Sequence, residues 1–194
     1  MSDKPVTMFD EFSKLPGPLI PAAARIMKLS NAYVVFNDTQ KVTSFNWGGF
    51  KDAVVAHPGT DLAFDKLQST SIANQTGIAQ FLVDTFALKA NNTDGLRAQI
   101  NSAFNTLDKK ESSGWFSSYK NEGHGSSWEY RIVFALPNPD HADWFYSVVS
   151  TIKLTADILE TQGWFGLTSE SRHNFTADIT AMELVVNKSY AYTS

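Results

Sequence analysis

The chain has 194 residues, of which 43% are hydrophobic and 19% are charged, and its formal net charge is −4 at pH 7. This balance is typical of a folded globular protein and argues against intrinsic disorder and against a nucleic-acid partner. The chain contains no cysteine, which excludes disulfides, thiolate nucleophiles and cysteine metal sites.

The N-terminal sequence MSDKPVTMFDEF contains acidic residues and a proline, and it lacks the apolar core of a secretory signal. No stretch of the chain approaches the roughly 18 apolar residues of a membrane-spanning helix. We therefore expect a protein that is soluble as made, with no recognisable signal peptide. Its length fits one domain, residues 1–194, that buries a core without cross-links.

Helical patterns dominate the first half of the chain. The alanine-rich stretch after LPGP predicts a helix over Pro21–Leu29, because proline suits the first turn of a helix. The segment SFNWGGFKDAVVAHPG predicts a loop and then a short helix that ends at His57, because Pro58 and Gly59 stop a helix.

Two amphipathic helices are predicted next, over Thr76–Leu88 and Thr93–Leu107, with a break at Asn91–Asp94. They pair as a hairpin, and each has one stripe of apolar residues at helical spacing. Such a stripe covers the apolar face of a sheet, although it could also lie in a membrane interface. The residues predicted to form this helical cover are Ile78, Phe81, Leu82, Leu96, Ile100, Phe104 and Leu107.

Strand periodicity replaces the helical pattern from about Lys109 onward. The predicted strands are Ser126–Leu136, Asp143–Ile158 and His173–Val186. The middle one, DWFYSVVSTIKLTADI, alternates apolar and polar residues over about 15 positions, or about 50 Å, whereas an ordinary strand has roughly 5–6 residues. Helices followed by long antiparallel strands, without a βαβ rhythm, predict an α+β fold.

The last predicted strand has an irregular pattern. Phe175, Ala177 and Ile179 are apolar at odd positions, and the apolar positions then shift to Met182 and Leu184. A shift of one residue predicts either a β-bulge or a strand that is covered on both faces.

No catalytic or metal-binding motif is present in the sequence. The four histidines are far apart, and the chain has no H-E-x-x-H, G-x-S-x-G, P-loop or G-x-G-x-x-G motif. We therefore expect no enzyme activity, no metal and no cofactor. The densest polar cluster, Asp140, His141 and Asp143, fits a solvated turn between two strands. A hydrolase that uses Asp140 and His141 is the remaining enzymatic alternative.

Several stretches in a fixed order resemble a known family. AFNTL ends a predicted helix, a polar linker follows, Trp115 lies in a strand-like segment, and then come EYRIVFALPNP, DWFYSVVSTIKLTAD and FTADITAMELVV. This succession resembles the Cyt family of cytolytic δ-endotoxins over roughly Thr76–Val186. Within that family, the short chain without cysteine looks most like a pore-forming toxin from a mushroom.

The resemblance implies a Cyt-like α+β fold of one domain, in which a central antiparallel β-sheet of long strands is wrapped by two α-helical hairpins. It also implies a pore-forming, haemolytic toxin that binds membranes, oligomerises and lyses cells. The layer formed by Thr76–Leu88 and Thr93–Leu107 would move off the sheet at the membrane. The implied partners are the lipid bilayer of target cells and further copies of the chain, with no nucleic acid, and the protein would act at target-cell membranes after release.

The membrane-insertion candidates are the apolar positions of the three predicted strands, because a transmembrane strand needs only about 9–11 residues. They are Trp128, Tyr130, Ile132, Phe134, Trp144, Tyr146, Val148, Ile152, Leu154, Phe175 and Ile179. Arg131, Lys153 and Asp157 would then have to face a water-filled lumen or the interface. A basic residue on the lipid face costs about 2–4 kcal/mol at the midplane.

Two alternatives to pore formation remain open from the sequence. In carpet-like disruption, amphipathic helices lie in the headgroup region and no ordered pore forms. In the other, the chain is a non-lytic lectin-like binding or storage protein whose sheet never leaves its helices. Release of dye from protein-free liposomes separates this second alternative from a lytic toxin.

Overall fold

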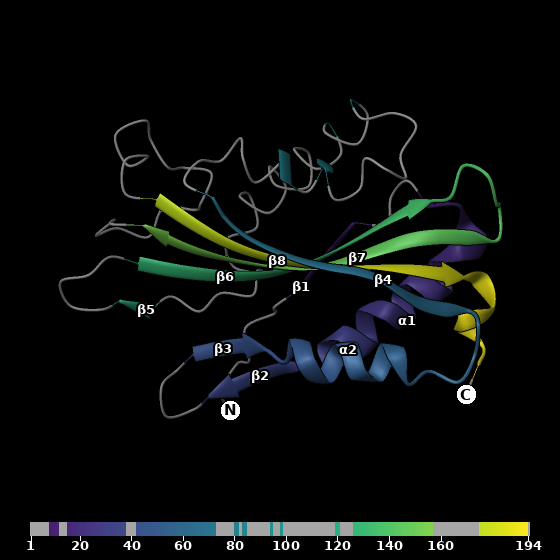
Figure 1. Cartoon of the computed structure of the whole chain (residues 1–194), viewed down its shortest axis with the longest axis horizontal. Coiled ribbons are helices and arrows are strands. Elements are labelled where there is room, and N and C mark those ends of the chain that lie inside the picture. The colour runs from purple at the N-terminus through teal and green to yellow at the C-terminus, as the bar shows by residue number, and fades with distance from the viewer. Residues whose placement is uncertain are drawn as a thin grey trace.

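The computed structural model describes residues 8–11, 15–37, 42–72, 80–81, 83–84, 94, 98, 119–120, 126–156 and 175–193. Within these ranges, long strands form a central sheet, and two α-helices lie together against one of its faces (Figure 1). The predicted α+β fold class is therefore confirmed.

Four long strands form the body of the sheet, in the order β6, β7, β8 and β4, and each is antiparallel to its neighbour. The short strand β1 pairs parallel with the outer edge of β6, and β5 pairs antiparallel with β6. The bounds are Met8–Glu11 for β1, Leu62–Ile72 for β4, Tyr119–Lys120 for β5, Ser126–Pro137 for β6, Trp144–Ala156 for β7 and Phe175–Asn187 for β8.

Three of the four long strands were predicted from the sequence. The predicted strand Ser126–Leu136 is β6, and the predicted strand Asp143–Ile158 is β7, whose described part ends at Ala156. The third is β8, which continues to Asn187. Alternation of apolar and polar residues identified them, and each strand has buried apolar residues at alternate positions among the side chains that the structure describes.

The fourth long strand, β4, was not predicted. Its pairing with β8 is interrupted between Phe64 and Lys66, so that Asp65 is an extra residue in β4. Leu62 and Phe64 therefore share a face with Leu67, three residues further on, and the period of two is lost. The polar sequence QSTS that follows further hides the strand.

The irregular pattern of β8 has its explanation in burial on both faces. The pairing of β8 with β7 is continuous from Asn187 to Phe175, so β8 itself contains no bulge. Residues 181–184 are all buried. Of the two structures that the pattern predicted, the strand covered on both faces is therefore the correct one, and the bulge lies in the neighbouring β4.

The helical layer on one face consists of α1, Ile20–Asn31, and α2, Trp47–Val55. A short 3₁₀ turn, η1 at Gly17–Leu19, leads into α1, and Pro21 lies in the first turn as predicted. A β-hairpin of β2, Val34–Asn37, and β3, Val42–Phe45, connects the two helices. This hairpin was not predicted, because its strands have only four residues each.

The second predicted helix is present but ends earlier than expected. Asn46 caps its N-terminus, where the side-chain oxygen accepts a hydrogen bond from the backbone N–H of Gly49 at 2.9 Å. The helix ends at Val55, with Ala56 as its C-cap, and not at His57. His57 lies beyond the helix end, immediately before Pro58, and its Nε2 is 2.7 Å from Asp61 Oδ1.

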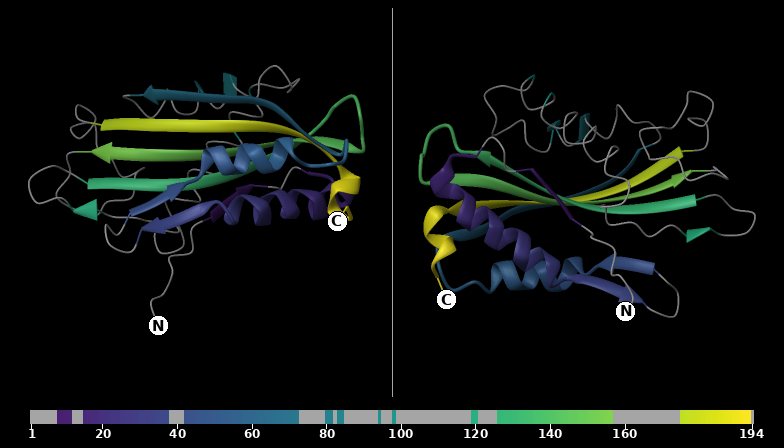
Figure 2. Two further views of the ribbon diagram at one scale, coloured as in Figure 1. Left: turned by 60° about the horizontal axis from the view of Figure 1, so that its bottom comes forward. Right: turned by 180° about the vertical axis from the view of Figure 1, so that it is seen from behind.

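The main core lies between this helical layer and the sheet (Figure 2). Ala22, Ala23 and Ile26 of α1 and Phe50 and Val54 of α2 are at most 2% exposed. They belong to one cluster with sheet residues that include Val133, Val149, Met182 and Leu184. Removing this apolar surface from water is the main stabilising contribution at this end of the sheet.

The predicted helical hairpin lies almost entirely outside the described residues. Of its predicted cover residues only Phe81 is described; it is helical and partly buried. Ile78, Leu82, Leu96, Ile100, Phe104 and Leu107 lie outside the described residues. Val83, which was not among the predicted cover residues, is fully buried. The short described segment at 80–84 lies on the side of the sheet opposite α1 and α2 (Figure 1).

Candidate functional site

The backbone register identifies which residues share a face of the sheet. Val133, Val149 and Met182 are directly paired across β6, β7 and β8, and all three belong to the core under α1 and α2. Directly paired residues in an antiparallel sheet lie on the same side. We call this side the α1–α2 face and the opposite side the far face.

The predicted insertion residues all fall on the far face. They occupy even positions in β6 and β7 and odd positions in β8, one residue out of step with the core residues just named. Ile152, for example, is paired with Tyr130 on one side and with Ile179 on the other. The positions are Trp128, Tyr130, Ile132, Phe134, Trp144, Tyr146, Val148, Ile152, Leu154, Phe175 and Ile179.

Most far-face side chains that the structure describes are buried. Among the predicted residues, those with at most 1% exposure are Ile132, Phe134, Val148, Ile152 and Ile179. Trp144 and Tyr146, at the start of β7, are half-buried. The Tyr146 hydroxyl accepts a hydrogen bond from Asn138 Nδ2 at 3.0 Å. The far face is thus a largely apolar surface that is shielded from water in this structure, with Ser150 and Glu183 as buried polar residues in its near half.

The α1–α2 face changes its character along the strands. We call the end that lies against α1 and α2 the near half and the other end the distal half. The near half comprises residues 132–137 of β6, 144–150 of β7 and 181–187 of β8, and the distal half comprises 126–131, 151–156 and 175–180. In the distal half, Lys153, Thr176 and Asp178 on the α1–α2 face are exposed, whereas Ile152 and Ile179 on the far face are buried.

On the exposed α1–α2 face of the distal half, side-chain hydrogen bonds connect neighbouring strands. Ser69 Oγ of β4 lies 3.0 Å from Thr180 Oγ1 of β8, and Ser71 Oγ donates to Asp178 Oδ1. Trp47 Nε1, at the start of α2, donates to Thr151 Oγ1 at 3.2 Å, which marks where the helical layer ends. The distal half is therefore amphipathic: one face is polar and in contact with water, and the other is apolar.

Among the residues that the structure describes, two charged side chains of the sheet are fully buried, one on each face. Arg131 lies on the α1–α2 face at the boundary between the two halves, and its Nη1 donates to Ser30 Oγ of α1 at 3.0 Å. Glu183 lies on the far face of the near half, where it is paired in register with Val148 and Lys66. Lys153 and Arg131 thus share the face expected for charged residues, but α1 covers Arg131. Asp157 lies outside the described residues.

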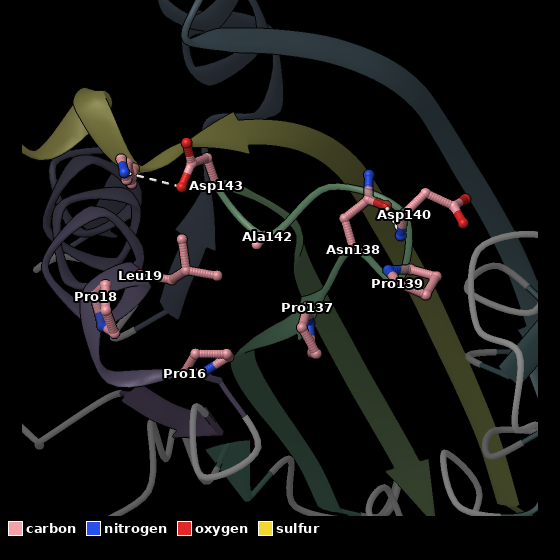
Figure 3. Close-up of a pocket in the computed structure, with 10 residues that line it drawn as sticks. Pro16, Pro18, Leu19, Pro137, Asn138, Pro139, Asp140, Ala142 and Asp143 are labelled. Atoms are coloured by element: carbon pink, nitrogen blue, oxygen red, sulfur yellow. Dashed lines mark hydrogen bonds and ion pairs between the residues drawn. The ribbon is translucent and has the colours of Figure 1, made fainter.

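The turn at 138–143 shows no catalytic arrangement. The Asp140 backbone N–H donates to Asn138 Oδ1 at 2.9 Å, and the His141 carbonyl accepts from the Trp144 N–H at 3.1 Å, so these residues shape the turn. The side chains of Asp140 and His141 are exposed. Beside the turn is a hollow of about 610 Å³ (Figure 3). Its lining is Pro16, Pro18, Leu19, Pro137, Asn138, Pro139, Asp140, Ala142, Asp143 and Lys188.

Polar contacts among Arg25, His57, Asp61, Tyr190 and Thr193, which we call the clasp, hold the C-terminal segment against the near half. After β8, the 3₁₀ turn η4, Lys188–Ala191, places Tyr190 against α1, where the Arg25 guanidinium stacks on its ring at 4.6 Å and donates to its carbonyl. Asp61 Oδ1 lies 2.7 Å from His57 Nε2, and Asp61 Oδ2 accepts from the Thr193 hydroxyl at 2.7 Å. Burial raises the pKa of Asp61, but the hydrogen bonds from Thr193 and His57 outweigh it, and the pKa lies below its ordinary value.

Neither a metal centre nor a spanning helix is found in the described part of the chain. No three His, Asp or Glu side chains among the described residues come together in a group that could hold a metal ion. No helix among them is long and apolar enough to cross a membrane.

Sequence reasoning missed the β4 contribution to this surface. Thr70 and Ile72 are β-branched residues two positions apart, which is only a weak strand signal within this polar sequence. The bulge at Asp65 separates this signal from the apolar start of the strand. The burial of Glu183 was also missed, because an acidic residue in a strand is ordinarily expected to be exposed.

Two solved structures are similar to this one in fold. One is a δ-endotoxin, with a TM-score of 0.66 and 14% identity, covering 95% of this chain and 82% of that chain. The other is the activated Cyt2Ba monomer from Bacillus thuringiensis subsp. israelensis, with a TM-score of 0.67 and 13% identity, covering 93% of this chain and 97% of that chain. No protein with a curated description matches the chain.

The sequence itself also matches a family. The model of the Bacillus thuringiensis toxin family matches residues 53–191, which is more than half of the chain and includes the end of α2, all four long strands and η4. The members of this family are cytolytic toxins that act on membranes and are not enzymes. The chain therefore belongs to the Bacillus thuringiensis toxin family of Cyt-type δ-endotoxins.

Proposed function

We propose that this protein is a pore-forming toxin that binds a lipid bilayer, oligomerises there and inserts its long β-strands. Membership of a family of membrane-active cytolytic toxins supports the general activity. The insertion mechanism is our inference, and it rests on the geometry of the sheet.

The observation that carries the proposal is the separation of polar and apolar residues in the distal half. Ile152 and Ile179 are buried on the far face, and Lys153 and Asp178, one position away in each strand, are exposed on the α1–α2 face. A transmembrane strand with one side toward lipid and the other toward water needs this alternation. β6, β7 and β8 have 12, 13 and 13 residues, more than the roughly 9–11 that a tilted strand requires.

The far face can reach lipid only if its protein cover leaves. The described segment at 80–84, with the buried Val83, lies on that side of the sheet. We infer that the helical hairpin predicted over Thr76–Leu88 and Thr93–Leu107 moves away at the membrane. Lipid then replaces protein as the apolar partner of the far face, so that the inserted strands lose little hydrophobic stabilisation.

Oligomerisation follows from the number of strands. The structure describes four long strands in one chain, whereas closed transmembrane sheets use about 8 strands or more. Several copies must therefore associate before backbone groups at the sheet edges are satisfied in the bilayer. We also propose that residues 1–194 act as one domain, and that the nearest functional likeness is to volvatoxin, the pore-forming mushroom toxin.

Dye release from protein-free liposomes tests the proposal. Purified protein should release a small dye and lyse red cells, while a dye conjugated to a large dextran stays inside the liposomes, because a pore has a limiting diameter. Release of both dyes together would favour carpet-like disruption. Intact liposomes with protein bound to them would indicate a non-lytic binding protein and contradict the proposal.

A further inference from the structure

A lysine and an aspartate occupy facing positions toward each end of β7 and β8. Lys153 and Asp178 are directly paired in the distal half. Asp143 and Lys188 flank the other end, where their side chains form an ion pair of 2.9 Å. All four side chains are exposed, but only the first pair lies within the strands.

The Lys153–Asp178 pair belongs to a row that crosses four strands. In register, Ser71 of β4 is paired with Asp178, Asp178 with Lys153, and Lys153 with Glu129 of β6. Ser71 Oγ donates to Asp178 Oδ1, which fixes this carboxylate on the α1–α2 face. The row thus brings the Asp178 carboxylate and the Lys153 ammonium group to one level of the sheet, and Glu129 is the β6 residue that the register places at the same level.

Neighbouring rows do not cancel this charge. The row toward the near half contains Ser69, Thr180, Thr151 and Arg131, and Arg131 is fully buried beneath α1. On the other side, Thr176 is paired with Thr155, and neither carries a charge. Among the described side chains of the distal half, Lys153 and Asp178 are the exposed ionised groups on this face, and we call the row that contains them the charge row.

We propose that Lys153 and Asp178 determine the ion selectivity of the pore, with Glu129 as the third charge of the row. The inference rests on the proposed function, because it requires the strands to line a pore. The far face of the distal half is apolar at Ile152, Ala177 and Ile179 and suits lipid, so the α1–α2 face of the distal half must face the water-filled lumen. Repeated around an oligomer, the row becomes a ring with a net charge of −1 per chain. Such rings of carboxylates favour cations.

Charge-reversal variants in planar bilayers test the assignment. With a KCl gradient across the bilayer, the reversal potential of the wild type should indicate a preference for potassium. Lys153→Glu should increase the cation-to-anion permeability ratio, and Asp178→Lys should lower it, each by roughly threefold or more. The double variant Lys153→Asp with Asp178→Lys restores the sum of charges, so its ratio should return close to the wild-type value.

Matched controls come from the second pair. Lys188→Glu and Asp143→Lys change the total charge of the protein by the same amounts, but they lie beyond the ends of the strands. Their reversal potentials should stay at the wild-type value. Equal shifts in the control and test variants would mean that overall charge, and not this row, controls permeation, and the proposal would be wrong.

The remaining outcomes separate this inference from the proposed function. Conducting pores with the same reversal potential in Lys153→Glu, Asp178→Lys and the wild type would overturn the inference alone. If the charge-reversal variants form no pores, the neutral variants Lys153→Gln and Asp178→Asn are measured instead. Loss of conductance in the neutral variants would also contradict the inference, because neutral polar residues are compatible with a water-filled lumen. A wild type that forms no pores would refute the proposed function.

Discussion

The near and distal halves of the sheet differ in what each face contacts. In the near half, most residues on both faces are buried, and α1, α2 and the C-terminal clasp hold one side. In the distal half beyond Arg131 and Thr151, the described residues on the α1–α2 face are exposed and polar, while Ile152, Ala177 and Ile179 on the far face are apolar and buried. The same strands pass through both halves, so the difference arises from side chains and cover and not from backbone structure.

We infer from this difference that the near half stabilises the fold and the distal half acts at the membrane. The near half contains the core that stabilises the folded monomer, since its apolar residues have partners on both faces. The distal half has a polar face that is already in water and an apolar face that can exchange protein for lipid. Substitutions in the near half should therefore change folding stability, and those in the distal half should change membrane activity.

The largest expected effect is on the near-half core. Phe50 of α2 is fully buried against the sheet cluster. Phe50→Ala should lower the free energy of unfolding by about 3–5 kcal/mol, because it removes buried surface and leaves a cavity. Urea unfolding followed by circular dichroism measures this. Val55→Ala is the control in the same helix: Val55 is 63% exposed, and its loss should cost no more than about 0.5 kcal/mol. Similar losses for the two variants would contradict this location of the core.

The next largest effect is expected on haemolysis, when a lysine is placed on one or the other face of the distal half at two adjacent residues of β4. Thr70 is half-buried and paired with Ile179 on the far face, and Ser71 is exposed on the α1–α2 face. A lysine on the lipid face costs about 2–4 kcal/mol near the bilayer midplane, so Thr70→Lys should reduce haemolysis by more than about tenfold.

Ser71→Lys is the matched comparison, because the new charge would face water. It should reduce haemolysis much less than Thr70→Lys does, and thermal unfolding should show that both variants are folded before the assay. If the two variants lose activity equally, the assignment of the two faces fails.

A smaller effect is expected from the clasp of the near half. Asp61→Asn removes a carboxylate that interacts with His57 and Thr193, and it should lower the free energy of unfolding by about 2 kcal/mol, the scale of hydrogen bonds to a charged group. Thr193→Ala should produce part of the same loss. No change in either variant would show that the clasp does not stabilise the monomer.

The pH dependence of this contribution has a defined sign. The pKa of Asp61 is lowered in the folded state, so its stabilisation is fully present above the unfolded-state pKa and is lost as the pH falls through the folded-state pKa. As the pH falls below about 4, the difference in stability between wild type and Asp61→Asn should therefore narrow. A difference that widens in acid would contradict the lowered pKa.

The smallest effect tests the boundary between the halves, where α2 begins. Asn46 caps α2 through the Gly49 N–H, and the next residue, Trp47, contacts Thr151 of β7. Asn46→Ala should cost about 1 kcal/mol of folding stability, and Asn46→Ser, which keeps a capping oxygen, should recover most of it. Chemical unfolding measures both variants, and equal losses would show that the cap is not what stabilises this end of α2.

Much of the fold could be read from patterns that repeat within one element. Pro21 and the alanines after it predicted α1, and the alternation around Ile152 and Lys153 predicted β7. These patterns depend on residues that are neighbours in the chain, so no tertiary information was needed. β4 was not predicted because its bulge at Asp65 breaks the two-residue alternation of a strand. The β2–β3 hairpin was not predicted because its strands are too short to show that alternation.

By itself, the sequence determined that this protein has long amphipathic strands after a helical first half, and which residues of each strand share a side. Only the tertiary structure decided how those sides align between strands. Pairing of segments far apart in the chain places Lys153 beside Asp178, buries Arg131 and Glu183 on opposite faces, and adds β4 next to β8. Register is a relation between strands, and periodicity within a strand fixes its two faces without specifying which residue of another strand lies opposite.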